Sequence, residues 1–177
     1  MSDMVLGDIR LTRVLENEEF ILTPEEVFPD YDPAVFARHM DWLAPRHYQP
    51  DTNMIVVTNQ TYLLQTPDRT ILVDGAGGNE KDRNRPFFHQ RHWPWLENLA
   101  AAGVKPEDID TVVCTHMHVD HVGWYTTRVD GKWMPTCPNA EYLFVQQEWD
   151  HWDPLSRETG LPRTGDYMKD SVRPIVE

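Results

Sequence analysis

Short apolar runs separated by polar turns dominate the first half of the chain, and this pattern predicts a sheet. Residues 8–15 alternate partly in polarity and indicate an edge strand, which residues 20–22 continue or pair with. Three further runs at 54–58, 61–65 and 70–73 are separated by turn residues. We therefore expect three consecutive antiparallel strands there, forming the centre of the sheet.

Helical spacing of apolar residues occurs in three places. Residues 33–42 begin with a proline and place apolar side chains three and four positions apart, which is typical of a short amphipathic helix. Pro94 opens a second predicted helix, and Gly103 ends it. Residues 166–176 predict a third helix.

A strand predicted at 109–114 follows the second helix, so the chain contains a strand, helix and strand in succession. Such a unit usually connects parallel strands, and open α/β sheets bind ligands at the carboxyl ends of those strands. An Asp-Gly pair indicates a hairpin over 128–133, and residues 141–145 predict another strand. The pattern indicates the α/β class, and we expect one domain over residues 1–177.

Composition narrows the possible functions. The chain has 177 residues, of which 40% are hydrophobic and 25% charged, as in globular proteins. A net charge of -13 argues against nucleic acid as a partner, because a phosphate backbone needs a basic surface. We see no apolar run of membrane-spanning length, no signal peptide and too few cysteines for a disulfide framework. These features predict a cytoplasmic protein without a membrane partner.

Candidate chemistry is concentrated directly after the strand at 109–114. His116, His118, Asp120 and His121 place three imidazoles and one carboxylate within six positions. Imidazole and carboxylate together suit zinc, iron, manganese or nickel. His116 and His118 are two residues apart, so in an extended segment both side chains reach one ion.

Asp120 and His121 are adjacent, so in an extended segment they would point in opposite directions. A turn or helix start at Val119 would instead direct both toward a second ion. We therefore expect a two-metal site, which lowers the pKa of a bridging water and stabilises the negative charge that develops during hydrolysis. Asp120 would be a ligand, a proton acceptor from that water, or both.

At these residues the chain resembles the metallo-β-lactamase superfamily of hydrolases, in which H-x-H-x-D-H follows a strand. Residues 70–77 resemble the family's strand that ends in an aspartate and a glycine-rich turn. Residues 138–143, followed by Glu148 and Trp149, resemble its lactonase-like and organophosphate-hydrolase-like branches. The resemblance covers roughly residues 50 to 152, and its most specific part is the ligand motif.

The resemblance implies a role for each matching residue. His116 and His118 would ligate the first metal, Asp120 and His121 would ligate the second, and both ions are expected to be zinc. Asp74 would lie behind the ligands and orient one of them or the motif backbone. An ordinary turn residue at the end of a strand is an equal alternative for Asp74, because glycines follow it.

Complete members of the family carry further ligands after this region: a third histidine for the first metal, a bridging carboxylate, and a last histidine. Only His151 follows His121 in this chain. The resemblance therefore implies the N-terminal half of an αββα sandwich with flanking elements, a single domain that is incomplete at its C-terminus. Half a sandwich exposes a sheet face, and we expect homo-oligomers through that face.

The leading functional hypothesis is a metal-dependent hydrolase of an ester-like bond in a small molecule, with a lactone as the favoured substrate. A β-lactam amide, a thioester and a phosphotriester remain open. Trp124 and Trp133 are candidates for the walls of a substrate pocket, with core packing as the alternative. Two other functions are retained: a catalytically incompetent structural or interaction module, and iron-based redox chemistry on the same ligands.

Overall fold

A computed structural model describes residues 3–177, except for the side chain of Phe20. The chain forms two compact units. The larger unit contains the described residues up to Glu16 together with Asn59–Glu177, and the smaller is Asn17–Thr58. None of the helices in the described residues is long and apolar enough to cross a membrane.

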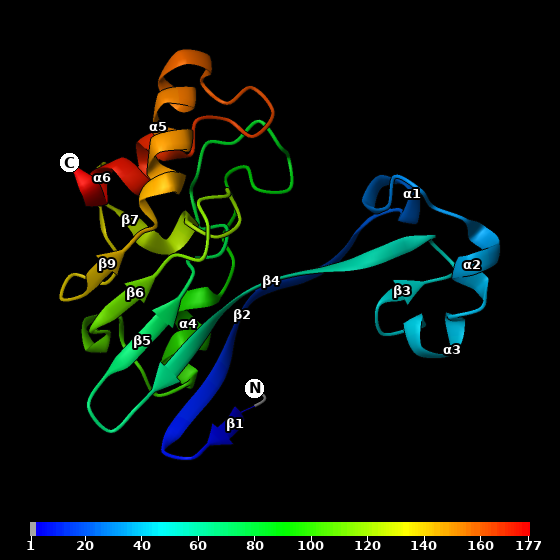
Figure 1. Ribbon diagram of the computed structural model, residues 1–177, viewed down its shortest axis with the longest axis horizontal. Coiled ribbons are helices and arrows are strands. Elements are labelled where there is room, and N and C mark those ends of the chain that lie inside the picture. The colour runs from blue at the N-terminus through cyan, green and yellow to red at the C-terminus, as the bar shows by residue number, and fades with distance from the viewer. Residues whose placement is uncertain (1–2) are drawn as a thin grey trace. The chain divides into compact units, whose positions relative to one another are not determined.

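A mixed sheet forms the centre of the larger unit, with the strand order β1-β2-β4-β5-β6-β9 (Figure 1). The strands are β1 (Asp3–Leu6), β2 (Ile9–Leu22), β4 (Met54–Gln65), β5 (Thr70–Val73), β6 (Thr111–Val113) and β9 (Glu141–Leu143). β4 and β5 are antiparallel, whereas β5, β6 and β9 run parallel to one another. This parallel part carries the loops of the candidate site.

One face of the sheet forms the core. Leu63, Leu72 and Val112 are neighbours in register on β4, β5 and β6, and each is at most 1% exposed. Helix α4 (Trp95–Ala101) covers this face, and Trp95 Nε1 donates to Thr61 Oγ1 at 3.0 Å. Complete burial of each aliphatic side chain stabilises the fold by about 1.5–3 kcal/mol.

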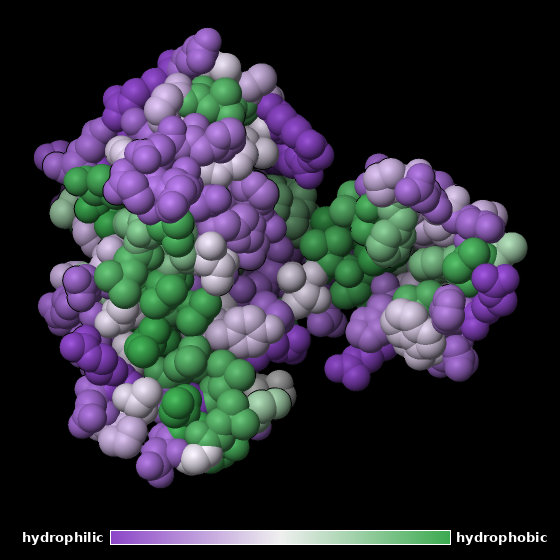
Figure 2. Space-filling view, in the orientation of Figure 1, coloured by the Kyte–Doolittle hydropathy of each residue, from purple (hydrophilic) through white to green (hydrophobic). Residues whose placement is uncertain are grey.

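The other face of the sheet is more exposed. Tyr62 and Leu143 project from it and are 36% and 45% exposed, and Val145 after β9 is 48% exposed. Figure 2 shows apolar side chains gathered over these strands. The apolar surface expected on one sheet face is thus present in this structure.

Short elements complete the larger unit. They are η1 (Pro106–Asp108), η2 (Gly123–Tyr125), the hairpin β7 (Thr126–Val129) and β8 (Lys132–Pro135), α5 (Gln146–Thr159), the π-helical turn η3 (Met168–Val172) and α6 (Arg173–Val176). The predicted hairpin is confirmed, and its Asp130 and Gly131 both have positive φ, as the turn requires. Helix α5 was not predicted from the sequence.

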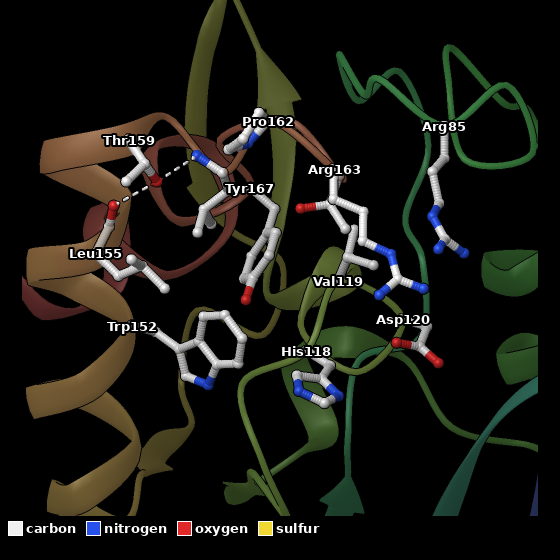
Figure 3. Close-up of a pocket in the computed structure, with 12 residues that line it drawn as sticks. Arg85, His118, Val119, Asp120, Trp152, Leu155, Thr159, Pro162, Arg163 and Tyr167 are labelled. Carbon is white, nitrogen blue, oxygen red and sulfur yellow. Dashed lines mark hydrogen bonds between the residues drawn. The ribbon is translucent and has the colours of Figure 1, made fainter.

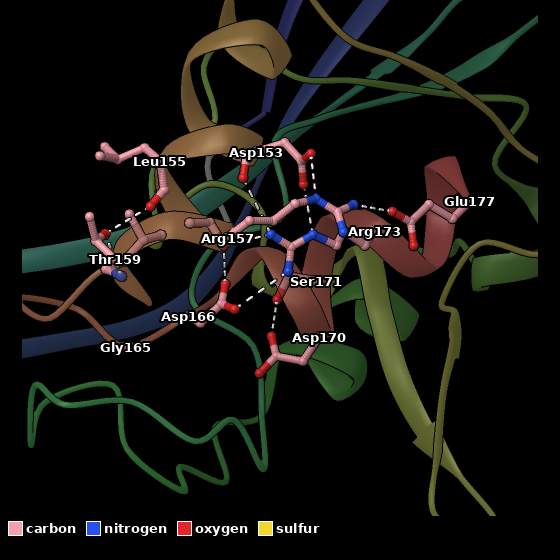
Figure 4. Close-up of polar contacts among 12 residues, drawn as sticks. Asp153, Leu155, Arg157, Thr159, Gly165, Asp166, Asp170, Ser171, Arg173 and Glu177 are labelled. Atoms are coloured by element: carbon pink, nitrogen blue, oxygen red, sulfur yellow. Dashed lines mark hydrogen bonds and ion pairs between the residues drawn. The ribbon is translucent and has the colours of Figure 1, made fainter.

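Ion pairs that range from buried to partly exposed hold α5 and the C-terminal residues in place (Figure 4). Arg173 Nε donates to Asp153 Oδ1 at 2.7 Å, and Arg157 Nε donates to the other oxygen of that carboxylate at 2.8 Å. Arg83 forms a two-bond pair with Asp170 at 2.6 and 2.8 Å. A two-bond pair of this kind is strong and fixes orientation, so Arg83 anchors η3, whereas the bond from Arg173 to Asp153 joins α6 to α5.

The smaller unit contains α1 (Pro24–Val27), α2 (Pro33–Ala37), α3 (Met40–Leu43) and β3 (Tyr48–Gln49), which pairs with β4. The single helix predicted over 33–42 is wrong, because α2 and α3 are separate. Neither helix buries a residue, so packing does not extend them into one longer helix.

Two strand predictions also need correction. The strand predicted at 8–15 is not at the edge, because β1 pairs with it on the outside. The runs at 54–58 and 61–65 form one continuous strand, β4, rather than an antiparallel pair. The polar residues between them, Asn59 and Gln60, lie within the strand, where Asn59 is buried.

Candidate metal centre

Two loops that follow parallel strands meet at one edge of the sheet. Val73 and Val113 are the last paired residues of β5 and β6, so Asp74 and Thr115 leave the sheet side by side. Asp74 N donates to Val113 O at 2.9 Å. The motif thus follows the carboxyl end of its strand, as the sequence predicts, and lies beside Asp74.

Backbone hydrogen bonds join the two loops. Gly75 N donates to His121 O at 2.6 Å, Trp124 N donates to Gly75 O at 2.6 Å, and Gly123 N donates to Ala76 O at 2.8 Å. These bonds fix the position of the motif relative to the turn after β5. They also satisfy backbone groups that the loops would otherwise bury unpaired.

Gly123 permits this close approach. A Cβ atom at this position would lie 1.9 Å from Gly77 O, which is far inside van der Waals contact. The loops therefore meet only because position 123 has no side chain.

Asp74 lies beneath the motif with a left-handed backbone, φ 64°. Its carboxylate accepts hydrogen bonds from Thr115 N at 2.8 Å and from Thr115 Oγ1, and its Oδ2 lies 2.9 Å from His121 Nδ1. Burial raises the pKa of Asp74, but the hydrogen bonds from His121 and Thr115 outweigh burial and lower it. The carboxylate is thus both a turn residue and a partner of one motif histidine.

Four residues of the motif converge in space. The ring centroid of His116 lies 4.5 Å from that of His118 and 4.0 Å from that of His121. A turn closed by the bond from His121 N to His118 O brings Asp120 Oδ2 within 3.6 Å of His121 Nε2. This turn begins where the sequence analysis expected one.

The charges around the imidazoles shift their pKa values in opposite directions. Burial lowers the pKa of His116, and the neighbouring imidazoles of His121 and His118 lower it further. Burial also lowers the pKa of His121, but the hydrogen bond to Asp74 and the charge of Asp120 outweigh it, so that the pKa is raised. With Nδ1 facing Asp74, the Nε2 atom of His121 faces the cluster, which is the orientation expected of a metal ligand.

Glu148 of α5 is a second carboxylate that supports the motif, at a different point from Asp74. Its Oε2 accepts from Met117 N at 2.8 Å and from Trp152 Nε1 at 3.1 Å. Trp152 in turn packs against His118, with ring centroids 5.2 Å apart. Sequence reasoning assigned no role to Glu148 or Trp152, although their spacing of four, which places both on one side of a helix, was a usable signal.

The donor set fits a transition metal in its chemistry, because three imidazoles and a carboxylate lie within a few ångströms of one another. The geometry is not that of a closed site. In residues 3–177, no three His, Cys, Asp or Glu side chains are arranged so as to hold one ion. The described residues therefore match a metal in their donor chemistry but not in their arrangement.

A cavity of about 570 Å³ opens beside the cluster (Figure 3). His118 and Asp120 line it, together with Arg85, Val119, Trp152, Leu155, Thr159, Leu161, Pro162, Arg163, Thr164 and Tyr167. Most of its wall comes from α5 and the loop that follows it, and sequence reasoning did not assign any of these residues to a pocket. Their chain positions carry no periodic signal that links them to the motif.

Trp124 and Trp133, the expected pocket walls, do not line this cavity. Trp124 is 3% exposed and stacks on Trp95, with ring centroids 4.9 Å apart. The Trp133 ring lies under Lys81 Nζ at 3.7 Å. Trp124 therefore belongs to the core, which was the alternative to a pocket wall in the sequence analysis.

A buried carboxylate on β2 holds the glycine turn after Asp74. Glu16 is 1% exposed and accepts from Gly77 N at 2.9 Å, from Gly78 N at 2.8 Å and from Trp124 Nε1 at 2.6 Å. Burial raises the pKa of Glu16 to about 7, although these hydrogen bonds oppose the shift. Glu16 thus connects the turn after β5 to the segment after the motif.

Comparison with known proteins identifies similar sequences and similar folds. N-acyl homoserine lactonase AiiB of Agrobacterium fabrum is 27% identical over 118 residues, which are 60% of this chain and 42% of that protein. The hydrolase AbOPH in the beta lactamase superfamily has a TM-score of 0.67 at 24% identity, covering 91% of this chain and 50% of that one. AidC, a dizinc quorum-quenching lactonase, has a TM-score of 0.63 at 21% identity, covering 85% and 46%.

The chain spans about half the length of these relatives, or less. The structural likeness confirms the predicted fold class, a mixed α/β architecture built on a large mixed sheet. The profile of the metallo-beta-lactamase superfamily matches residues 55–176. Because this match runs from Ile55 in β4 to the end of α6 and includes the whole motif, the chain belongs to the metallo-beta-lactamase superfamily.

Proposed function

We propose that the protein acts as a metal-dependent hydrolase of an ester-like bond, with a lactone as the favoured substrate. The observation that carries this proposal is the convergence of three imidazoles and two carboxylates, from the ends of β5 and β6, beside a cavity. Family membership supports the reaction class. The relatives named as lactonases support the substrate class.

The proposal gives each motif residue a task. His116 and His118 would hold one divalent ion, Asp120 and His121 would hold a second, and zinc suits this donor set. Ions bound there would lower the pKa of water and stabilise negative charge on a carbonyl oxygen. Asp120 lines the cavity with a side chain that is 40% exposed, so it is placed to accept the proton of an attacking water.

The supporting residues restrict motion of the ligands. Asp74 holds Nδ1 of His121, which leaves Nε2 available toward the cluster. Glu148 holds the backbone between His116 and His118 through Met117 N. Both contacts restrict the conformations of the motif, so binding of a metal ion would cost less conformational entropy.

His116→Ala tests the proposal, because it removes the imidazole nearest to both other histidines. We expect the variant to lose bound metal and to hydrolyse a lactone at least about 100-fold more slowly than the parent. Metal content is measured by elemental analysis and turnover by release of acid. His151→Ala is the matched control, because His151 is an exposed histidine outside the cluster.

The substrate panel for this test includes a lactone, an aryl ester, a thioester and a phosphotriester. The proposal is wrong if the protein binds metal but hydrolyses none of them, while His116→Ala leaves the metal content unchanged. Metal identity in protein purified without added metal separates a zinc hydrolase from iron redox chemistry.

One observation favours a second candidate, a non-catalytic interaction module. Within the described residues the donors do not close around an ion, and one sheet face exposes apolar side chains. Size-exclusion chromatography with metal analysis separates the two functions. A metal-free assembly supports the module, whereas a species with about two metals per chain supports the hydrolase.

A further inference from the structure

The cavity beside the motif has one charged side and one apolar side. Arg85 and Arg163 lie on the side of Asp120, whereas Trp152 and Leu155 lie on the opposite side (Figure 3). Two guanidinium groups thus face a single carboxylate, although the chain as a whole has a net charge of -13. The local charge of the cavity is therefore the reverse of the charge of the protein.

Neither guanidinium group is used elsewhere in the fold. Among residues 3–177, the side chains of Arg85 and Arg163 make no hydrogen bond and no ion pair. By contrast, Arg83, Arg157 and Arg173 all pair with carboxylates. Two guanidinium groups without a partner at one cavity are available to bind an anionic ligand.

A buried hydroxyl group in the same wall also has no partner. Tyr167 lines the cavity and is 2% exposed, and its hydroxyl makes no hydrogen bond within the described residues. Burial raises the pKa of Tyr167 well above its usual value, so the hydroxyl keeps its proton and remains a donor. A ligand oxygen in the cavity would supply the missing acceptor.

We propose that this cavity binds an acidic substrate with an apolar chain, the chain lying against Trp152 and Leu155 and a carboxylate group lying between Arg85 and Arg163. Guanidinium groups bind carboxylates through paired, charge-assisted hydrogen bonds, and aromatic and aliphatic walls bury the chain. The inference rests on the proposed hydrolase, because His118 and Asp120 of the same cavity belong to the candidate metal centre. It narrows the substrate class to esters or lactones that carry a second, acidic group.

Binding of two matched probes tests this without turnover. Octanoate carries the chain and the charge, whereas octanamide carries the chain alone. We expect octanoate to bind the purified protein at least about tenfold more tightly by calorimetry, because a charge-assisted bond outweighs a neutral one. The double variant Arg85→Ala, Arg163→Ala should lose this preference and bind octanamide as the parent does.

The double variant Arg128→Ala, Lys132→Ala, which removes two exposed cations of the β7–β8 hairpin away from the cavity, is the control for the change in net charge. It should bind octanoate as the parent does. Tyr167→Phe, which removes only the hydroxyl, should weaken octanoate binding about fivefold. Added salt should weaken octanoate binding and leave octanamide binding unchanged.

Three outcomes would overturn the inference. They are equal affinity for the two probes, no binding of either probe, and a preference for octanoate that survives in the double arginine variant but disappears after chelation. The last result would assign the carboxylate to the metals instead of to the arginines. Binding of the probes requires no hydrolysis, so the two proposals can fail separately. If the protein prefers octanoate but hydrolyses no substrate, only the proposed hydrolase is contradicted. If it hydrolyses a substrate but shows no preference for octanoate, only this inference is contradicted.

Discussion

Two buried carboxylates hold the loops of the candidate metal centre, and their surroundings move their pKa values in opposite directions. Asp74 is surrounded by donors from Thr115 and His121, which lower its pKa despite burial. Glu16 also accepts three hydrogen bonds, but its deeper burial raises its pKa to about 7. The balance between desolvation and donors therefore decides the charge of each residue.

The raised pKa of Glu16 predicts a pH-dependent stability. A carboxyl group whose pKa is about 7 when folded and 4.5 when unfolded stabilises the fold below the lower value. That contribution is lost as the pH rises through the higher value. From about pH 5.5 to about pH 8.5, the parent should lose roughly 2 kcal/mol of unfolding free energy relative to Glu16→Gln.

Urea unfolding of both proteins across this pH range measures the difference. The variant is the internal control, because it keeps the size of the side chain and cannot titrate. Parallel curves for the two proteins would contradict the prediction. They would show that the bonds from Gly77, Gly78 and Trp124 keep Glu16 ionised throughout.

At the scale of elements, the site depends on the parallel pairing of β5 and β6. Parallel strands end at the same edge of the sheet, so the loop after β5 and the motif after β6 meet without any long excursion. Helix α5 then adds a second support, through Glu148, and most of the cavity wall. Three elements that are distant in sequence thus position the side chains of the motif.

Gly123→Ala is predicted to separate the two loops. The added Cβ atom would overlap Gly77 O, so the loops must move apart and break the bond from Gly123 N to Ala76 O. We expect a loss of at least about 3 kcal/mol in unfolding free energy, together with weaker metal binding.

Gly131→Ala is the matched control in the exposed hairpin. Gly131 has a positive φ, but nothing lies within 4 Å of an added Cβ atom. That change should cost about 1 kcal/mol and leave metal binding intact. Equal effects of the two substitutions, measured by denaturation and metal titration, would show that the close approach at position 123 is not required.

At the scale of the whole molecule, one sheet face lacks a covering layer within the described residues. Tyr62, Leu143 and Val145 are exposed on or beside it, and Figure 2 shows the apolar surface there. Apolar patches of this kind favour association in water. The homo-oligomer expected from the sequence remains a proposal that this surface supports.

Leu143→Glu tests that proposal, because it places a charge on the exposed sheet face, at the last residue of β9. We expect the parent to associate with rising concentration, and the variant to remain monomeric to at least about tenfold higher concentration. Analytical ultracentrifugation measures both. Val129→Glu, at an exposed apolar position of the β7–β8 hairpin, is the control. A parent that is monomeric at all concentrations would contradict the prediction.

Local sequence determined the short elements and the ligand motif. The β-branched run 70–73, the helix between Pro94 and Gly103 and the Asp-Gly hairpin were all predicted correctly, because hydrophobic period and turn residues act over a few positions. The four motif residues were recognised for the same reason, since their spacing within one segment carries the signal.

Tertiary structure alone decided which distant groups support the site. Glu16 meets the glycine turn across 61 residues of chain, and Glu148 meets the motif across 31. Strand pairing creates these contacts, and the hydrophobic pattern within each segment does not predict them. The same holds for Trp124, an aromatic residue near the motif that packing places in the core, and for Arg85 and Arg163, which only folding brings to one cavity. Short-range preferences decide the elements, whereas burial and pairing between distant segments decide the site.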